Sequence, residues 1–452
     1  MPVAKDIIDR TLATPYGENA YKIVEMLTDK GFDAWWVGGA ARDMLQGKIP
    51  TDIDIATSAT PRDILAVFPK ATVTPKALGS TRVPMKSDVF EVTTFREDDE
   101  KSDGRFPEAV VFSTREKDAA RRDFTVNAMY FHPISRAFYD PFDGEADLRE
   151  KLIRFIGDPA IRIKHDALRL LRAVRFRAQI DGQYHPDTYR ALGEQAALVE
   201  TLSGTRQLEE LEKMLLTEHP SLALEDLWEL HILEHFIPEL HACKGVPQPA
   251  QYHHEGDVWN HLMSCLQAFR AEDGIDVRIA ALFHDIGKVE TFSLEERIRF
   301  DHHATMSSEI TTGVLTRLQM PKKRIEKIAW LIKHHMMMGS FFDMPDERKT
   351  HWYYHPWFPE LLQLFYLDAA GTTPTDLSLY EKIIDDYQHF LDKHPRPEKP
   401  LLSGNDIMAI RGVGSGEDVG KMIARLQVEQ INGKVTTKKE AEEFIKSLTL
   451  EN

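Results

Sequence analysis

Cysteine and long apolar runs are scarce in this 452-residue sequence. Cys243 and Cys265 are its only cysteines, which excludes a disulfide framework and is typical of a protein in a reducing cytosol. No stretch approaches the roughly 20 apolar residues that span a bilayer. Residues 1–21 also lack the apolar core of a signal peptide. These absences predict a cytoplasmic protein with no membrane partner.

Net positive charge is also missing, since the formal charge at pH 7 is −16. This balance argues against indiscriminate binding of nucleic acid, but total charge does not describe local patches. Between Arg149 and Arg177, nine lysines and arginines outnumber three acidic residues, which gives a local charge of +6. An acidic chain can therefore still present a basic groove to a polyanion.

Hydrophobic periodicity divides the chain into two kinds of structure. Short β-branched runs predict strands within AWWVGG, DIDIAT, VFEVTTF, AVVFST and FTVNAMYF. Helices are predicted over residues 17–31 and within 58–68, where a proline stands near the start. From Leu148 onward helical periodicity takes over, and a proline-rich linker follows at residues 394–404. A chain of this length is expected to form about two to four domains.

Two aspartates one residue apart raise the first functional question. Asp52 and Asp54 alternate with Ile53 and Ile55, so on a strand both carboxylates would point to one face. Such a pair is costly unless a cation lies nearby. Taken alone, Asp-Ile-Asp is more typical of an exposed strand edge.

The surrounding residues favour a phosphate-handling site. Glu91 lies in another predicted strand, and three carboxylates on neighbouring strands could hold two Mg²⁺ ions for phosphoryl or nucleotidyl transfer. Gly38 and Gly39 permit close approach of a phosphate, and Arg42 adds a cation one helical turn later. A further group, which precedes another strand-like run, comprises Arg121, Arg122 and Asp123.

Four segments together resemble the bacterial class II tRNA nucleotidyltransferases (CCA-adding enzymes) and the related bacterial poly(A) polymerases. The segments are GGAARDMLQG…TDIDIAT, EVTTFR, RRDFTVNAM and GDPAIRIKHDALRLLRAVRF. The resemblance implies an α+β protein with a polymerase-β-like head (residues 1–147). It also implies an all-helical neck and body for nucleotide selection and RNA binding (148–242), an HD domain (243–393) and a tRNA-binding tail (394–452).

The same resemblance assigns roles to the head residues. Asp52 and Asp54 would be Mg²⁺ ligands, and Glu91 would complete the catalytic carboxylates. Nucleotide binding would fall to Gly38, Gly39, Arg42, Arg121, Arg122, Asp123, Asp166, Arg169, Arg172 and Arg175.

The last four of these residues recur every third position. At about 100° per residue, Asp166, Arg169 and Arg172 would share an arc of roughly 120° on one helix. Without the head motifs this row would be typical of a solvated basic helix face. With them it resembles the family's nucleotide-selecting motif. Asp166 would accept from the exocyclic amino group of cytosine or adenine, and Arg169 would donate to the ring nitrogen.

Three local features bear on specificity. The family's usual glutamate before the selecting aspartate is replaced by His165, and residues 79–85 (GSTRVPM) replace a His-Gly-Thr type turn. The segment 94–112 keeps the full length of the loop that is mobile in CCA-adding enzymes and shortened in CC-only relatives. Its length favours complete CCA addition.

Histidines in four separated helical segments predict a second site. HHEGDVWNHL, ALFHDIGK, FDHHATMSS and IKHHMM resemble the HD-domain signature. One ion would be held by His261, His284, Asp285 and Asp368, and a second by His303 and His335. Imidazole and carboxylate ligands suit Mn²⁺, Ni²⁺, Fe or Zn²⁺. Satisfied core histidines are the alternative, and hydrolysis, a binding surface or a relic all remain open.

The sequence therefore predicts template-independent addition of CCA to tRNA from CTP and ATP, with Mg²⁺ and release of pyrophosphate. One alternative is a poly(A) polymerase or an A-adding enzyme. Another is an HD phosphohydrolase with a non-catalytic RNA-binding head. The glycine-rich segment 411–422 resembles a phosphate loop but lacks a preceding strand, so it predicts a turn that caps a helix.

Overall fold

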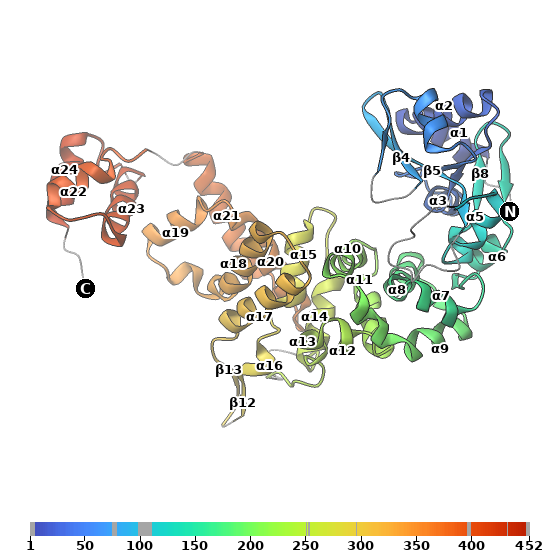
Figure 1. Cartoon of the computed structure of the whole chain (residues 1–452). Coiled ribbons are helices and arrows are strands. Elements are labelled where there is room, and N and C mark those ends of the chain that lie inside the picture. Colours follow the sequence, from blue (N-terminus) through green and yellow to red (C-terminus); the bar gives the residue numbers. More distant parts are fainter. Residues whose placement is uncertain are drawn as a thin grey trace. The chain divides into compact units, whose positions relative to one another are not determined.

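The computed structural model describes residues 5–74, 79–97, 111–249, 251, 254–294, 296–395, 399–431 and 433–448. The chain separates into two compact units, Met1–Pro238 and Glu239–Asn452 (Figure 1). Within the described ranges, no helix is both long and apolar enough to cross a membrane. Most of the loop whose length favours CCA addition, residues 98–110, lies outside these ranges.

A seven-stranded sheet forms the centre of the first part of the N-terminal unit, in the order β3-β4-β5-β2-β1-β8-β9. β2 and β5 run parallel, whereas the other neighbouring strands pair antiparallel. The strands are β1 (Ala34–Val37), β2 (Asp54–Thr57), β3 (Thr72–Val73), β4 (Ser80–Met85), β5 (Asp88–Thr94), β8 (Tyr130–His132) and β9 (Ala137–Tyr139). A separate pair comprises β6 (Arg96–Glu97) and β7 (Val111–Phe112).

The first predicted helices form where their end signals lie. α2 (Pro15–Asp29) begins after Thr14, whose side chain accepts from the Gly17 N–H, and is followed by Gly31 at φ +83°. α4 (Pro61–Val67) begins with a reciprocal capping box between Thr60 and Asp63. The other helices around the sheet are α1 (Lys5–Ala13), α3 (Gly39–Leu45), α5 (Arg115–Ala120) and α6 (Gly144–Arg149).

One predicted strand is wrong in its first half. Residues 124–131 were expected to be extended, but Thr125–Asn127 forms a 3-10 turn and the strand begins only at Tyr130. The Asp123 carboxylate explains the turn, because it accepts from the Phe124 N–H at 2.8 Å and from the Asn127 amide at 3.1 Å. These local hydrogen bonds replace strand pairing.

The rest of the N-terminal unit is helical except for one short strand pair. The expectation of an all-helical region is wrong here, because β10 (Leu152–Ile153) pairs parallel with β11 (Gln183–Tyr184). The backbones of the two segments lie close together, since a Cβ on Gly182 would lie 2.2 Å from the Lys151 carbonyl oxygen. The helices are α7 (Pro159–His165), α8 (Leu168–Ile180), α9 (Pro186–Glu194), η2 (Ala196–Thr201), α10 (Gly204–Leu215), α11 (Pro220–Glu229) and α12 (Leu233–Phe236), and α13 (Pro238–His241) crosses the unit boundary.

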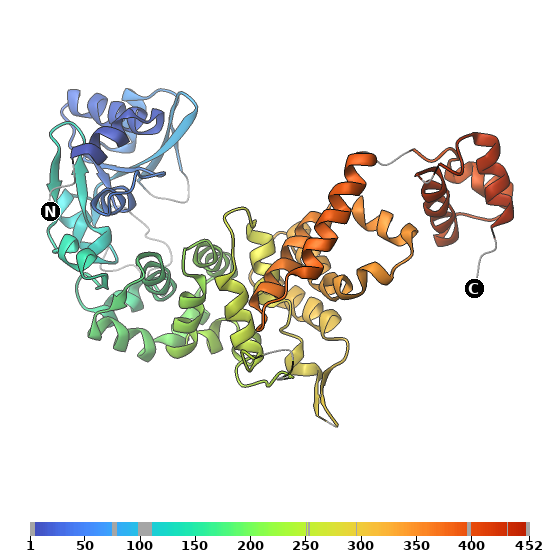
Figure 2. The same ribbon diagram turned by 180° about the vertical axis from the view of Figure 1, so that it is seen from behind.

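Among its described residues, the C-terminal unit is helical apart from the hairpin of β12 (Phe292–Leu294) and β13 (Ile298–Phe300), a second departure from the all-helical expectation (Figure 2). Gly412, at φ +67°, ends α22, and α23 begins at Glu417, so the glycine-rich segment is a helix-capping turn as predicted. The helices are α14 (Val258–Gln267), α15 (Ile275–Phe283), α16 (Lys288–Thr291), α17 (His303–Arg317), α18 (Lys322–His334), η3 (His335–Asp343), α19 (Asp346–Tyr353), α20 (Phe358–Gly371), α21 (Ser378–Lys393), α22 (Gly404–Arg411), α23 (Glu417–Ile431) and α24 (Lys438–Ser447).

Candidate active site and candidate metal centre

A cavity of about 640 Å³ in the N-terminal unit collects the residues that the sequence singles out there. All thirteen head and neck candidates line it, together with Asn127, Phe176 and Lys213. The thirteen are Gly38, Gly39, Arg42, Asp52, Asp54, Glu91, Arg121, Arg122, Asp123, Asp166, Arg169, Arg172 and Arg175. Residues more than 130 positions apart in sequence therefore share one space (175 − 38 = 137).

The carboxylate wall follows from strand alternation. Asp54 opens β2 and pairs with Val37 of β1, and Glu91 comes from β5, the parallel neighbour of β2. Asp52 precedes the strand rather than lying in it. The alternation nevertheless holds, because Ile53 and Ile55 are buried whereas Asp52 and Asp54 are not.

Negative charge accumulates at this wall. Desolvation, followed by the charges of Asp52 and Glu91, raises the pKa of Asp54 to about 6, although Arg122 acts in the opposite direction. The Tyr16 hydroxyl donates to Asp52 at 3.3 Å, and burial raises the pKa of that phenol to about 12. A set of oxygen ligands with excess negative charge fits Mg²⁺.

Opposite charge gathers beside the glycine turn. Gly38 adopts φ +62° between β1 and α3, and a Cβ there would lie 3.5 Å from Arg122 Nη1. Arg42 is buried, and its Nη1 donates to Asn127 Oδ1 at 2.8 Å. The guanidinium groups of Arg42 and Arg122 therefore lie beside the backbone of the glycine turn, where no side chain blocks access to them.

A buried carboxylate holds the two consecutive arginines in place. Asp118 accepts from Arg121 Nη2 at 2.7 Å, from Arg122 Nη2 at 3.2 Å and from the Tyr130 hydroxyl at 2.7 Å. Asp123, by contrast, faces α8 and accepts from Arg172 Nε at 2.6 Å. Burial alone would raise the pKa of Asp123, but Arg172 and the hydrogen bonds outweigh it and lower the pKa to about 2.

The predicted row of nucleotide-selecting residues is not on a single helix. Asp166 has extended backbone (φ −151°) between α7 and α8, and its carboxylate accepts from the Leu168 N–H at 3.2 Å. Only Arg169, Arg172 and Arg175 lie on α8. The spacing misled because a helix break at an aspartate that caps the next helix leaves the three-residue count unchanged. The Asp166 side chain still lines the cavity.

Partners from α10 hold this row, and the sequence analysis did not identify them. Arg206 Nη2 lies 3.0 and 3.1 Å from the two oxygens of Asp166. Glu210, which is buried, accepts from Arg175 Nε at 2.6 Å. Arg206 and Glu210 are one helical turn apart in a sequence that reads as an ordinary amphipathic helix, so only tertiary contact reveals them.

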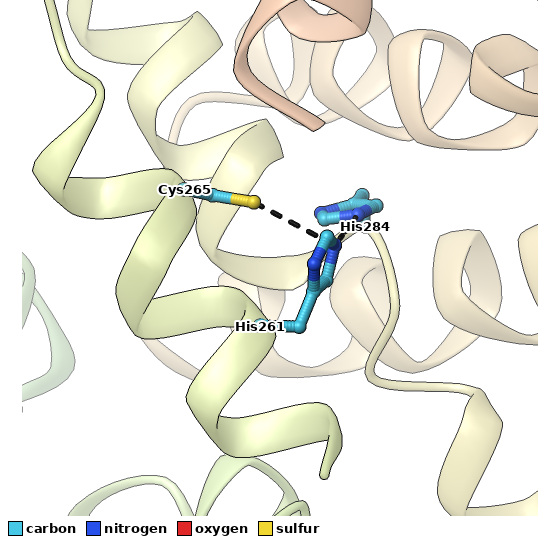
Figure 3. Close-up of side chains that lie close together, drawn as sticks. All are labelled: His261, Cys265 and His284. Atoms are coloured by element: carbon cyan, nitrogen blue, oxygen red, sulfur yellow. Dashed lines mark hydrogen bonds between the residues drawn. The ribbon is translucent and has the colours of Figure 1, made fainter. Parts of the chain in front are cut away.

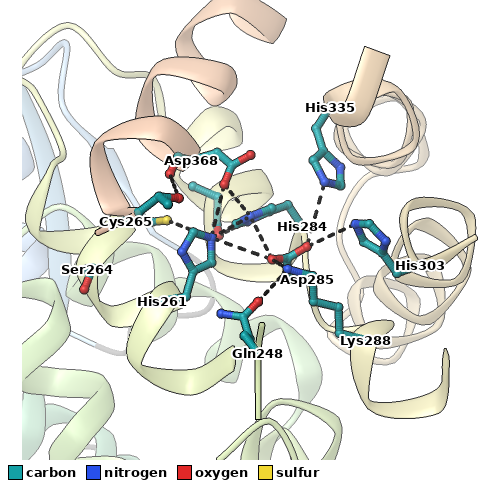
Figure 4. A network of polar contacts seen from close by, with 12 residues as sticks. Gln248, His261, Ser264, Cys265, His284, Asp285, Lys288, His303, His335 and Asp368 are labelled. Carbon is teal, nitrogen blue, oxygen red and sulfur yellow. Dashed lines mark hydrogen bonds and ion pairs between the residues drawn. The ribbon is translucent and has the colours of Figure 1, made fainter. Parts of the chain in front are cut away.

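The six HD candidates lie together in the C-terminal unit (Figure 4). His261 Nε2 is 3.2 Å from His284 Nε2 and 3.2 Å from Asp368 Oδ1. Asp285 Oδ1 lies 3.4 Å from His303 Nε2 and 3.8 Å from His335 Nε2. The residues come from α14, the end of α15, α17, η3 and α20.

The ring orientations suit metal binding. The Nδ1 atoms of His284, His303 and His335 lie 2.9, 2.9 and 2.7 Å from backbone carbonyl oxygens, so each Nδ1 carries the proton and each Nε2 offers a lone pair. Burial and His284 lower the pKa of His335 to about 4, which keeps that ring neutral. A bound cation could lie between these donor atoms, because His261 Nε2 is 3.2 Å from His284 Nε2 and Asp285 Oδ1 is 3.4 Å from His303 Nε2. The donor set therefore fits a transition metal.

A cavity of about 630 Å³ opens beside this cluster. Its wall includes Asp285, His303, His335 and Asp368 from the cluster, and the cations Lys288, Arg297 and Arg299. Lys288 Nζ lies 2.6 Å from Asp285 Oδ2 and donates to Gln248 Oε1 at 2.6 Å. The cluster thus opens into a recess that carries both cations and carboxylates, since Asp301 and Asp376 also line it.

Family profiles match most of the chain in the order that the sequence suggested. They are described as a poly A polymerase head domain (residues 34–154), a probable RNA and SrmB-binding site of polymerase A (183–244) and an HD domain (252–386).

Individual relatives carry three related names. The CC-adding tRNA nucleotidyltransferase of Thermus thermophilus is 31% identical over 91% of this chain and 93% of that protein. The CCA-adding enzyme of Geobacillus stearothermophilus is 41% identical over 44% of this chain and 50% of that protein. The A-adding tRNA nucleotidyltransferase of Deinococcus radiodurans is 31% identical over 73% of this chain and 78% of that protein.

The fold agrees with these relatives. The crystal structure of the Bacillus stearothermophilus CCA-adding enzyme in complex with CTP superposes with a TM-score of 0.67 at 26% identity, covering 96% of this chain and 97% of that one. The family implies a divalent metal, for which both sites have suitable donors. The chain belongs to the class II CCA-adding tRNA nucleotidyltransferase and poly(A) polymerase family with an HD domain, and it is a tRNA nucleotidyltransferase.

Proposed function

We propose that this chain adds the complete CCA sequence to the 3′ end of tRNA, using CTP and ATP and releasing pyrophosphate. The observation that carries the proposal is the single cavity that joins a carboxylate wall, a glycine turn with arginines and a nucleotide-selecting pair. In this proposal, residues 1–147 catalyse, 148–242 select the nucleotide and bind RNA, and 394–452 bind tRNA.

Each wall of the cavity has one task. Asp52 and Asp54 hold Mg²⁺, with Glu91 completing the carboxylate set; when bound, the ions activate the 3′ hydroxyl and neutralise the departing pyrophosphate. The glycine turn admits the triphosphate, and Arg42, Arg121 and Arg122 hold its oxygens. Asp118 and Asn127 keep those guanidinium groups in position.

Asp166 and Arg169 select the base. Cytosine and adenine both present an amino donor beside a ring-nitrogen acceptor, which match a carboxylate and a guanidinium. Uracil and guanine present the opposite pattern, so both contacts become repulsive. Arg206 Nη2 contacts Asp166 at 3.0 Å, and Arg169 donates to the carbonyl oxygens of Arg162 and Arg121 at 2.7 and 3.3 Å. These contacts hold both side chains at the cavity wall.

The identity of the product is tested by substrate choice. The protein is incubated with tRNA ending in the discriminator base, in C or in CC, with each NTP separately. We expect C to be added to the first two and A to the third, consistent with the full-length segment 94–112. Addition of C without A, as the Thermus relative's name states, or of A alone, as the Deinococcus relative's name states, would overturn the proposal. Long A tails would indicate a poly(A) polymerase.

We also propose that the HD cluster hydrolyses phosphoesters with a bound transition metal. The supporting observation is the recess beside the cluster, where Lys288, Arg297 and Arg299 can contact a phosphate group although Asp301 and Asp376 also line it. Release of p-nitrophenol from bis-p-nitrophenyl phosphate, tested with Mn²⁺, Ni²⁺ and Zn²⁺ in turn, checks this activity. Hydrolysis without any nucleotide addition would instead favour an HD phosphohydrolase with a non-catalytic head.

A further inference from the structure

A buried thiol adjoins the HD cluster (Figure 3). Cys265 follows His261 by four residues on α14, which places both side chains on one face of the helix. Its Sγ is 3.6 Å from His261 Nε2, and the metal-binding atoms of His261, Cys265 and His284 all lie within 4.8 Å of one another. The histidines and aspartates of the HD signature do not include this cysteine.

The spacings match a tetrahedral ion. Zinc bonds of about 2.0–2.1 Å to nitrogen or oxygen and about 2.3 Å to sulfur place tetrahedral N–N or N–O pairs roughly 3.3 Å apart and N–S pairs roughly 3.6 Å apart. Here His261 Nε2 lies 3.2 Å from His284 Nε2, 3.2 Å from Asp368 Oδ1 and 3.6 Å from Cys265 Sγ. His284 Nε2 is 3.5 Å from Asp368 Oδ1.

Tight packing of α14 against α20 brings the thiol and Asp368 to the same point. Gly371, one turn after Asp368, has no side chain, and a Cβ there would lie 2.4 Å from Cys265 Sγ and 2.7 Å from the Cys265 nitrogen. The close approach holds Cys265 in the cluster rather than at the surface, and its side chain is fully buried. Asp285 Oδ2 lies 3.6 and 3.5 Å from the Nε2 atoms of His261 and His284, but it is also 2.6 Å from Lys288 Nζ. Its Oδ1 instead lies near His303 and His335.

We propose that Cys265 is a thiolate ligand of a Zn²⁺ ion that His261, His284 and Asp368 also bind. The inference rests on the proposal that the HD cluster holds a metal. On binding, the Cys265 S–H bond breaks, its proton leaves to solvent and an S–Zn bond forms. Thiolate favours a soft ion, and four protein ligands close its coordination. Hydrolysis then falls to a second ion at Asp285, His303 and His335, which form a group of potential ligands and, like Asp368, line the recess.

Cobalt substitution tests the ligand directly. The full-length protein is stripped of metal and titrated with Co²⁺, and absorption is followed for the near-ultraviolet charge-transfer band that only a thiolate ligand produces. The wild type is expected to show this band. Cys265→Ser should lose it and should bind Zn²⁺ at least about tenfold more weakly, the lower bound for disturbing even a group outside a ligand set. Cys243→Ser is the matched control, because Cys243 is equally buried and is the only other cysteine.

The outcomes separate the two proposals. Co²⁺ binding by the wild type without a thiolate band overturns the Cys265 assignment and leaves the HD metal proposal standing. Absence of any metal binding overturns both. A band that persists in Cys265→Ser but disappears in Cys243→Ser assigns the thiolate elsewhere. If Cys265→Ser fails to fold, a band that persists in Cys243→Ser still assigns the thiolate to Cys265, because the sequence has no other cysteine.

Discussion

The charge state of the Asp54 carboxylate depends on whether a cation is bound next to it. Its geometry with Asp52 suits metal binding rather than RNA contact, so Asp52→Ala or Asp54→Ala should abolish nucleotide incorporation and leave tRNA affinity nearly unchanged. Single-turnover extension and a filter-binding assay measure the two quantities. Incorporation by Asp52→Ala within about tenfold of the wild type would reject the metal assignment, since a tenfold rate change is only about 1.4 kcal/mol.

The raised pKa of Asp54 makes a pH prediction. Because this pKa is about 6 in the folded chain and 3.8 in the reference state, the folded state binds more protons between these values. Stability attributable to Asp54 therefore falls as pH rises from about 4 to about 6. In metal-free buffer, the melting temperature of the wild type should fall across this window relative to Asp54→Asn. Added Mg²⁺ should narrow the difference at pH 7, and an identical pH dependence for both proteins would contradict the assignment.

The Asp166→Ala variant should lose discrimination between nucleotides before it loses nucleotide-adding activity. In Asp166→Ala, the carboxylate that repels the carbonyl groups of uracil and guanine is gone. Misincorporation of UTP and GTP should therefore rise by roughly one to two orders of magnitude, because one buried unpaired contact costs about 1–3 kcal/mol. Arg169→Ala should do likewise with a larger loss of rate, and His165→Glu should keep or sharpen selectivity. Single-turnover extension of tRNA ending in C with each NTP gives the ratios.

Arg206 supplies the control for that experiment. Arg206→Ala keeps the Asp166 carboxylate but removes its bidentate partner, so we expect a smaller loss of discrimination than in Asp166→Ala. Arg190, an exposed arginine outside the cavity, is the matched comparison and should change nothing. An unchanged CTP-to-UTP ratio in Asp166→Ala would show that this segment does not read the base.

The pairing of α8 with α10 depends on a buried ion pair. Glu210 Oε2 lies 2.6 Å from Arg175 Nε, and the side chains of Glu210 and Arg175 are 2% and 12% exposed, respectively. Glu210→Ala leaves Arg175 unpaired and should lower the free energy of unfolding of the N-terminal unit by about 3–5 kcal/mol. Urea unfolding checks this, with each transition fitted separately because two units need not unfold together. The exposed neighbour Glu209, changed to alanine, should cost less than about 0.5 kcal/mol. Equal effects would contradict the pairing.

Local sequence signals predicted some elements well and others poorly. α2 and α4 formed at their caps, and the alternation around Asp54 predicted the cavity wall, because these features depend on neighbouring residues. The break at Asp166 was missed, since a capping aspartate preserves helical spacing across two helices. Arg206 and Glu210 were missed because their partners lie 40 and 35 residues away in sequence. No periodicity encodes such contacts.

At the level of the whole chain, the order of the motifs along the sequence predicted the family better than any single motif did. The head and HD candidates fall in separate compact units; the head set lines one cavity, and four of the six HD candidates line another. The geometry of the HD cluster could not be predicted from the sequence, because α14, α17 and α20 contribute candidate ligands that are more than 100 residues apart (368 − 261 = 107). No local pattern in the sequence predicts how these helices pack, and this packing directs the imidazole rings of the cluster toward one another.

The separation of the two cavities leads to the last prediction. His284→Ala and Asp285→Ala should remove any phosphodiesterase activity of the HD cluster, because each deletes a side chain from a group of potential metal ligands. The same variants should leave CCA addition largely intact, since the nucleotidyl-transfer cavity lies wholly within Met1–Pro238. Both reactions are measured on one preparation, with circular dichroism to verify folding. His389→Ala, which changes an exposed histidine of α21, is the control and should retain both activities. If folded His284→Ala protein loses nucleotide addition, the HD cluster takes part in that reaction and the two sites are not independent.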